Sequence, residues 1–412
     1  MTGKEPFDFD ATEQRPDPAL FEQPAAEPPY ARYRLTSPLH DEIARCSKTN
    51  LWTDWGEVTT PLTYTDAREE YQALRAAAAI GDISPLCKFR VSGNDATAYL
   101  SRLLASRVAT LAIHKASHVA MCSDTGHIIA DGLLFRMAEG DYRLTFLESH
   151  LDWMQDSAHG FNVLIEDIGP TVAGISLQGP ATFAVMQAAG FDEMQALAPF
   201  ESRWVELMGI PVYVSRTGQT GGLGVELWVD PEDAPLLWRL LMKNGAPLGL
   251  KPMGFSVRDL ARLEAGIPAA GVDYLSAHRA TDLLSVRTPL ELGLSVPLEG
   301  ETGPFTGQAA LKRACANPVR HRLIGLEVAA DGPVDFSALY AGPVRVGTAT
   351  TKGWSPLLAR NIALATVSAE GLADNVNLTV HAAVSEGVAM RRRQLDVRRL
   401  PRPFLAIDSK SG

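Results

Sequence analysis

Near residue 320 the segments of the chain change character, and this change limits its possible folds more than any other feature. Before it, helix-type and strand-type segments alternate, as in TDAREEYQALRAAAA (65–79) and CKFRVSG (87–93). After it, short β-type runs such as RHRLIGLEVAA (320–330) and NIALATV (361–367) are separated by turn residues. The pattern predicts mixed α+β domains followed by an all-β domain.

With 412 residues, the chain is too long for one typical core, so we expect two or three domains. Residues 1 to about 30 are rich in Pro, Asp, Glu and Ala. A disordered tail and an ordered arm on a partner subunit both fit this composition. The expected parts are a partly extended N-terminal arm (1–45), an α+β domain (46–170, completed by part of 250–300), a second α+β domain (171–300) and a C-terminal β domain (315–405).

Composition narrows the class of protein. Apolar residues make up 46% of the chain and charged residues 21%, which is typical of a globular protein in water. The net charge of −10 argues against a nucleic-acid partner, and the lack of a long apolar window argues against a membrane span. The N-terminus has no apolar signal-peptide core, and the four cysteines are far apart without a CxxC spacing. We therefore expect a cytoplasmic protein without a disulfide framework or zinc knuckle.

Two acids lie inside apolar strand-type runs, where an unpaired carboxylate is costly to bury. Asp131 belongs to IIADGLLF (128–135), and Glu226 belongs to GVELWV (224–229). Each acid either faces a cleft or is structurally paired or turned to solvent, and the residues alone leave both options open. The glycine cluster GQTGGLG (218–224) precedes a strand rather than a helix. It therefore predicts a tight turn at a ligand rather than a dinucleotide loop.

A histidine pair and a group of C-terminal arginines favour structural roles over ligand binding. His114 and His118 have a spacing that could bind metal on a helix, but no third ligand is nearby, so we expect no metal site. The C-terminal arginines favour an exposed β-edge whose charges block aggregation, with a patch for a carboxylate tail as the alternative. These arginines stand at positions 391–393, 398, 399 and 402.

Several motifs in one order resemble the glycine-cleavage T-protein (aminomethyltransferase) superfamily, over roughly residues 60–405. They include VSGNDATAYLSRLL (91–104), GHIIADGLLFRM (126–137), SRTGQTGGLGVELWV (215–229) and GFSVRDLARLEAGIP (254–268). The resemblance implies an α+β fold of three domains, two mixed and one a C-terminal β barrel, around a central tetrahydrofolate site. The form of residues 126–135 and 222–228 is more similar to that of folate-dependent aromatic O-demethylases.

The resemblance also implies roles for single residues. Asp131 would lie at the reacting centre beside the folate nitrogens, Glu226 would bind the pterin, and Arg258 would lie near the glutamyl tail. A methyl ether oxygen is a poor leaving group, and Arg136, Tyr64 or Tyr274 could stabilise it. The full expected set comprises the catalytic residues Asp131, Arg136 and Tyr64, the cofactor-binding residues Glu226, Arg258, Gln219 and Trp228, and a substrate wall of His127, Leu147, Pro85 and Tyr274.

Departures from the T-protein pattern point to a different substrate. Gln219 stands where that pattern has an aromatic residue, Leu147 where it has Asn, and Ala130 where it has a second acid. These positions lie near the aminomethyl substrate, so they argue against lipoyl-bound aminomethyl transfer. Ser84, Pro85 and Leu86 also replace the His pair that the O-demethylases carry after their first helix.

Three functions follow as hypotheses. The first is a tetrahydrofolate-dependent demethylase of a small methoxylated, lignin-derived aromatic such as vanillate or syringate. The second is a lyase without folate that releases formaldehyde from the hydroxymethyl side chain of such an aromatic. The third is a non-catalytic folate-binding protein, although the K-G-C-x-x-G-Q-E motif of the iron–sulfur assembly relatives is missing. A homodimer is possible in each case.

Overall fold

The computed structural model describes residues 35–282, 285–299, 303–317, 320–386 and 389–405. Most of the predicted N-terminal arm, residues 1–34, lies outside the described residues. The last part of that predicted arm is not extended, because α1 (His40–Cys46) is a helix whose Ile43 packs into an apolar core.

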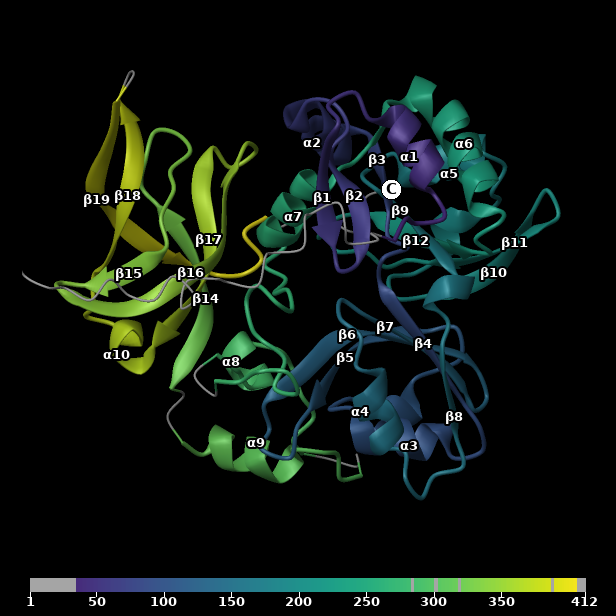
Figure 1. Cartoon of the computed structure of the whole chain (residues 1–412), viewed down its shortest axis with the longest axis horizontal. Helices are drawn as coiled ribbons and strands as arrows, with labels where there is room; N and C mark the ends of the chain where they lie inside the picture. Colours follow the sequence, from purple (N-terminus) through teal and green to yellow (C-terminus); the bar gives the residue numbers. More distant parts are fainter. Residues whose placement is uncertain (1–34, 283–284, 300–302, 318–319, 387–388, 406–412) are drawn as a thin grey trace, which may run out of the picture. The chain divides into compact units, whose positions relative to one another are not determined.

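A five-stranded antiparallel sheet with the order β5-β6-β7-β4-β8 forms the first layer (Figure 1). Apolar residues of α3 and α4 pack with it in one core cluster. A turn that includes residues 124–126 joins β5 to β6 in a hairpin. The elements are β4 (Cys87–Ser92), α3 (Ala96–Leu103), β5 (Ala116–Cys122), β6 (Ile128–Ala138), β7 (Asp141–Phe146), α4 (Leu151–Asp156) and β8 (Leu164–Asp167).

A six-stranded sheet with the order β10-β11-β12-β9-β3-β13 forms the second layer. The helices α5 and α6 pack against each other and share its largest apolar core. The elements are β3 (Ala78–Asp82), β9 (Ala173–Gln178), α5 (Thr182–Ala188), β10 (Ser202–Leu207), β11 (Ile210–Ser215), β12 (Gly224–Val229), α6 (Ala234–Gly245) and β13 (Leu250–Pro252). Sheet membership does not follow the predicted boundary at residue 170, because β3 pairs with β9 and β13.

The segment before β3 folds onto this second layer. The strands β1 (Leu51–Trp55) and β2 (Val58–Thr63) form a separate hairpin, followed by α2 (Ala67–Ala76). Asp66 caps α2 by accepting a hydrogen bond from the backbone N–H of Arg68 at 2.7 Å.

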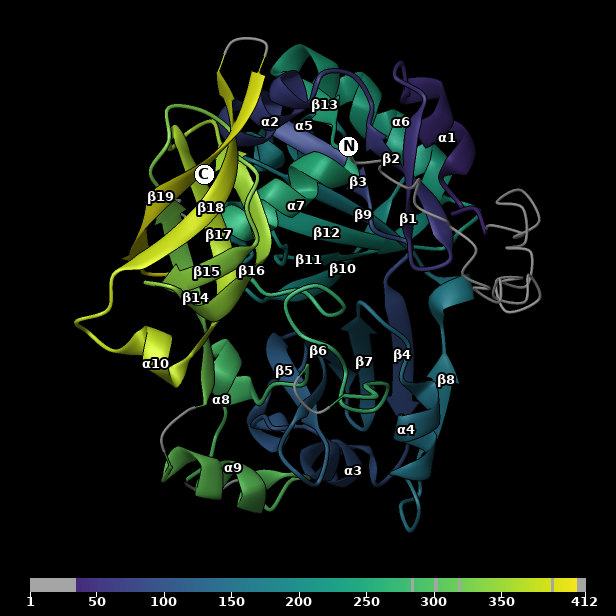
Figure 2. The same ribbon diagram turned by 60° about the vertical axis from the view of Figure 1, so that its left-hand side comes forward.

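The C-terminal part is a closed barrel of six strands, shown in green to yellow in Figure 2. Its closure confirms the predicted all-β domain and the α+β class of the whole chain. The arginine-rich strand β19 pairs with β18 over residues 389–397 and with β14 over residues 397–400. The elements are β14 (His321–Val328), β15 (Ala338–Ala341), β16 (Val344–Ser355), β17 (Arg360–Ser368), α10 (Ala369–Leu372), β18 (Leu378–Glu386) and β19 (Ala389–Leu400).

Between the second sheet and the barrel, the chain forms α7 (Phe255–Glu264), α8 (Pro289–Leu292) and α9 (Gln308–Cys315). The end of α7 carries buried charges that link separate parts of the fold. Glu264 accepts hydrogen bonds from the Tyr71 hydroxyl at 2.6 Å and the Ser355 hydroxyl at 2.5 Å, and it pairs with Arg75. This carboxylate therefore joins α7, α2 and the barrel strand β16.

We predict that Glu264→Ala lowers the free energy of unfolding by about 3–5 kcal/mol, because it leaves the buried Arg75 without its partner. Urea denaturation followed by circular dichroism measures the change. Glu69→Ala is the matched control, because the pair between Glu69 and Lys251 is exposed and should contribute less than about 1 kcal/mol. Equal losses in the two variants would contradict the linking role of Glu264.

Candidate active site

A cavity of about 640 Å³ lies where both sheets, the end of α7 and the C-terminal segment meet. Asp131 reaches it from β6 and Glu226 from β12, so the two predicted acids line one space. The rest of the lining is mostly apolar. It consists of Leu86, His118, Gly132, Leu133, Thr145, Phe146, Leu147, Phe200, Thr217, Gly218, Gln219, Ala265, Gly266, Ile267, Pro268, Leu292, Gly293, Leu294, Arg402 and Pro403.

Asp131 is held at both of its carboxylate oxygens. Nε2 of His118 lies 2.8 Å from Oδ2, and the hydroxyl of Tyr274 donates to Oδ1. The Asp131 side chain is only 8% exposed. The next residue must be glycine, because a Cβ at Gly132 would lie 1.9 Å from the carbonyl oxygen of Thr145. The close packing of β6 on β7 therefore fixes the position of this carboxylate.

His118 reaches Asp131 through the register of the β5–β6 hairpin. Its backbone pairs with Leu133, while Ala120 pairs with Asp131, so the two side chains are diagonal neighbours on one face. Burial lowers the pKa of His118, but the hydrogen bond and the charge of Asp131 outweigh it, so the net pKa is raised. The side chain is still 42% exposed. Asp131 therefore stabilises the protonated form of the His118 imidazole, which solvent and ligand can reach.

Tyr274 donates a hydrogen bond to the other carboxylate oxygen of Asp131, Oδ1. Its side chain is buried, and burial together with the negative charge of Asp131 raises its pKa well above the ordinary value. The phenol therefore remains a hydrogen-bond donor at neutral pH. Hydrogen bonds to both carboxylate oxygens fix the orientation of Asp131. Of Asp131, Tyr274 and His118, the exposed His118 is the residue that can exchange a proton with a ligand.

Glu226 has a different environment. It is only 4% exposed, and the Thr217 hydroxyl donates a 2.6 Å hydrogen bond to Oε2. Burial raises the pKa of Glu226 to about 7, although Thr217 and the charge of Arg258 oppose the shift. A small change in its surroundings, such as a ligand with N–H donors, is enough to ionise it at neutral pH.

Arg258 lies behind this carboxylate rather than in the cavity wall. Its guanidinium stacks on Trp55, with Cζ 3.4 Å from the ring centroid, and on Phe255 at 4.7 Å. Burial lowers the pKa of Arg258, but a guanidinium stays protonated at neutral pH. Its positive charge reaches Glu226 at a distance and favours the ionised carboxylate.

The structure brings four of the predicted site residues together in the cavity wall: Asp131, Glu226, Gln219 and Leu147. Tyr274 acts through Asp131. Pro85 lies next to the wall residue Leu86 but is not part of the wall.

Arg136 and Tyr64 need correction as catalytic candidates, because neither lines the cavity. Arg136 stands five residues after Asp131, so strand alternation turns it to the opposite face. There it donates to the Leu111 carbonyl at 2.8 Å and pairs with Glu139. Tyr64 is 1% exposed within the apolar core that includes α1.

His127 and Trp228 also lie away from the cavity. His127 belongs to the β5–β6 turn, where Nδ1 lies 2.9 Å from the Thr125 hydroxyl. Trp228 follows Glu226 by two residues but is buried in an aromatic cluster with Phe135, and its indole N–H donates to Ser215. The position of Trp228 gives no support to direct cofactor binding.

Sequence reasoning missed three wall residues, His118, Thr217 and Arg402, as members of the site. His118 was weighed only as a metal ligand with His114, yet a hairpin register centred on the turn at 124–126 would have placed it beside Asp131. Arg402 donates to the carbonyl oxygen of Leu292 at 2.7 Å and of Gly266 at 3.3 Å. The sequence marks Arg402 only as one of the C-terminal arginines, since its place in the wall depends on how the C-terminal segment crosses the fold.

Two features are absent from the described ranges. They contain no cluster of three or more His, Cys, Asp or Glu side chains that could hold a metal ion. No helix within them is both long and apolar enough to cross a bilayer.

Comparison with known proteins agrees with this geometry. Residues 46–296 match the family model described as the GCVT N-terminal domain. An aminomethyltransferase of Geobacillus kaustophilus (strain HTA426) is 34% identical over 342 residues, covering 81% of this chain and 90% of the relative. One from Bacillus cereus (strain AH187) is 30% identical over 377 residues, covering 89% and 97%.

A solved structure supports the fold. The glycine cleavage system aminomethyltransferase T from Bartonella henselae superposes with a TM-score of 0.78 at 22% identity. The match covers 90% of this chain and 98% of that one.

The raised pKa of Glu226 makes stability depend on pH. Between its ordinary pKa of 4.5 and its folded pKa of about 7, the folded protein binds more protons than the unfolded chain. Stability therefore falls as pH rises through this window. We predict that Glu226→Gln raises Tm relative to the unchanged protein at pH 8 and has a smaller effect at pH 5. A difference in Tm that is equal at both pH values would contradict the shift.

Proposed function

The chain belongs to the aminomethyltransferase family of one-carbon transfer enzymes, and we propose that it is a tetrahydrofolate-dependent demethylase of a small methoxylated aromatic. The observation that carries the proposal is one cavity that holds a buried carboxylate for a pterin, Glu226, and a separate Asp131–His118 pair for proton transfer.

The cavity suits tetrahydrofolate in size and in chemistry. Its walls are mostly apolar, as flat ring systems require, and Glu226 supplies a buried acceptor that can bind two N–H groups of a pterin edge. Thr217 fixes the plane of this carboxylate through its 2.6 Å hydrogen bond. Bound there, tetrahydrofolate would supply a nucleophilic ring nitrogen that accepts a one-carbon unit.

Other residues in the wall of the same cavity can move the proton that demethylation needs. Loss of a methyl group from an aromatic ether leaves a negative charge on the phenolic oxygen. The protonated form of His118, which Asp131 stabilises, is a general acid that can neutralise that charge. Asp131 orients the imidazole, stabilises its protonated form and stabilises positive charge at the reacting carbon.

Leu147, Gln219 and the neighbouring apolar wall support an aromatic donor. Leu86, Leu133 and Phe146 offer hydrocarbon surface to a flat ring. Leu147 stands where the T-protein pattern has Asn, so a polar contact for the aminomethyl group is lost there, and Gln219 stands where that pattern has an aromatic residue.

A second function is favoured by one specific observation, the His118–Asp131 pair. In its neutral form the same imidazole is a base that could take the proton from a hydroxymethyl group. The C–C bond to the aromatic side chain would then break and release formaldehyde, and the carbon left behind would take up a proton. Folate would have no part in this reaction.

One incubation separates the two functions. The protein is mixed with methoxylated and hydroxymethyl aromatics, with and without tetrahydrofolate, and free formaldehyde and 5-methyltetrahydrofolate are measured. We expect the methyl group of a methoxylated donor to appear on folate, with no turnover when folate is omitted. Free formaldehyde formed without folate would reject the demethylase and support the lyase.

For the demethylase, we predict that His118→Gln lowers kcat by about 10²–10⁴-fold, the usual contribution of a general acid. It should also remove the loss of activity at high pH that the unchanged protein shows as His118 loses its proton. Kinetics from pH 6 to 10 measure both effects. His159→Ala, which alters an exposed histidine near α4, should leave the profile unchanged. A His118→Gln variant that keeps the high-pH limb would contradict the role of His118.

A further inference from the structure

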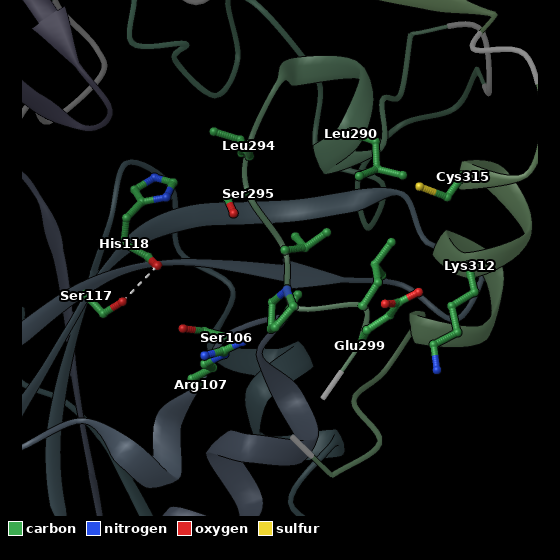
Figure 3. A pocket seen from close by; sticks show the side chains of 14 residues that line it. Ser106, Arg107, Ser117, His118, Leu290, Leu294, Ser295, Glu299, Lys312 and Cys315 are labelled. Atoms are coloured by element: carbon green, nitrogen blue, oxygen red, sulfur yellow. Dashed lines mark hydrogen bonds between the residues drawn. The ribbon is translucent and has the colours of Figure 1, made fainter. Parts of the chain in front are cut away.

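A second cavity of about 1080 Å³ adjoins the first one. His118 and Leu294 line both cavities, so these two side chains form a shared wall. We call the second space the outer cavity (Figure 3). The rest of its lining consists of Ala105, Ser106, Arg107, Ser117, Leu290, Ser295, Val296, Pro297, Leu298, Glu299, Lys312 and Cys315.

Arg107 stands beside β5 on the same side of the outer cavity as Ser117 and His118. Leu104 forms an antiparallel bridge with Met121, and the N–H of Ala105 donates to the Ala120 carbonyl at 2.8 Å. This alignment carries the chain from residue 104 to Arg107 along β5 towards His118. In the part of the chain that the structure describes, the exposed guanidinium of Arg107 has no hydrogen-bond or ion-pair partner.

The other charges of the outer cavity lie apart from Arg107. Figure 3 shows Lys312 and Glu299 at the opposite end from Arg107. These two carry opposite charges, so they contribute little net field. Arg107 is therefore the group that would attract an anion, and it would do so next to the shared wall.

Apolar residues line the outer cavity between Arg107 and the end that carries Lys312 and Glu299. Leu290 comes from α8, and Val296, Pro297 and Leu298 follow in the segment after it. Such walls suit a flat hydrocarbon ring, and Ser106, Ser117 and Ser295 offer hydroxyls at its rim.

We propose that the outer cavity binds the aromatic one-carbon donor, with an anionic substituent of the ring at Arg107 and the reacting group beside His118. The inference rests on the proposed function, because it names where and in which form the donor binds. A folate whose pterin bound Glu226 would occupy the first cavity, next to the strand β12 that carries this residue. The donor then needs a different approach to Asp131, and the shared wall of His118 and Leu294 provides one.

The kinetic test compares 4-hydroxy-3-methoxybenzoate with its methyl ester. Arg107→Ala should raise KM for the free acid about tenfold, as expected for the loss of one charge-assisted hydrogen bond at a partly exposed site, and should leave kcat and the ester unchanged. Arg102→Ala is the matched control, because Arg102 is also exposed, lies on α3 and does not line the outer cavity. Equal KM values for the two variants would overturn the proposal.

A binding test needs no turnover. Isothermal titration calorimetry with 4-hydroxy-3-methoxybenzoate measures the Kd of the donor directly. The Kd should rise about tenfold in Arg107→Ala and stay unchanged in Arg102→Ala. Ser106→Trp, which places an indole beside Arg107 in the outer cavity, should also weaken binding of the donor while this variant keeps its affinity for tetrahydrofolate. Equal Kd values for the unchanged protein and Arg107→Ala would overturn the proposal.

The two tests also separate this inference from the proposed function. Binding of the donor that depends on Arg107, without folate-dependent turnover, would support the outer cavity and reject the demethylase. Folate-dependent turnover with no effect of Arg107→Ala on KM or Kd would support the demethylase and reject the outer cavity.

Discussion

The fold depends on charge buried at the end of α7. Arg262 donates to Asp273 at 2.9 Å and to Thr351 of the barrel at 3.1 Å, while Glu264 binds Tyr71 and Ser355. Buried ions cost several kcal/mol each unless every one is paired, so these groups tolerate only the arrangement in which α2, α7 and the barrel meet. The residues directly after this helix end, 265–268, form one wall of the active cavity. The ionic contacts thus set the shape of the site as well as the packing of the parts.

The two carboxylates that line this cavity, Asp131 and Glu226, have different surroundings. Asp131 is hydrogen-bonded at both oxygens, to His118 and to Tyr274, whereas Glu226 is buried with Thr217 as its hydrogen-bond donor. Such a difference in environment is how a site assigns separate roles to like groups. Asp131 supports proton transfer through His118, and Glu226 is an acceptor for a ligand that brings N–H groups.

Much of the fold could be predicted from the sequence, because the periodicity of apolar residues is a local signal. The β5–β6 hairpin, α2 with its Asp66 cap, and the all-β C-terminal domain are examples. The membership of β3 in the second sheet was not predictable in this way, because strand pairing over about a hundred residues leaves no local trace.

The site was predicted less completely than the fold. The family resemblance found Asp131 and Glu226, but strand alternation turns Arg136 away from them, and packing against α1 buries Tyr64. His118 joins Asp131 only through the exact cross-strand register, and Arg402 only through the path of the C-terminal segment. Site residues whose positions depend on strand pairing or on the path of a distant segment could therefore not be predicted from the sequence.

The central claim is that this cavity binds a folate between Glu226 and the Asp131–His118 pair. A crystal structure of the protein with bound tetrahydrofolate tests it most directly. The account predicts the pterin edge within hydrogen-bond distance of the Glu226 carboxylate and the reactive face of the ring turned towards Asp131. A pterin bound elsewhere, or one that leaves Glu226 without a contact, would contradict it.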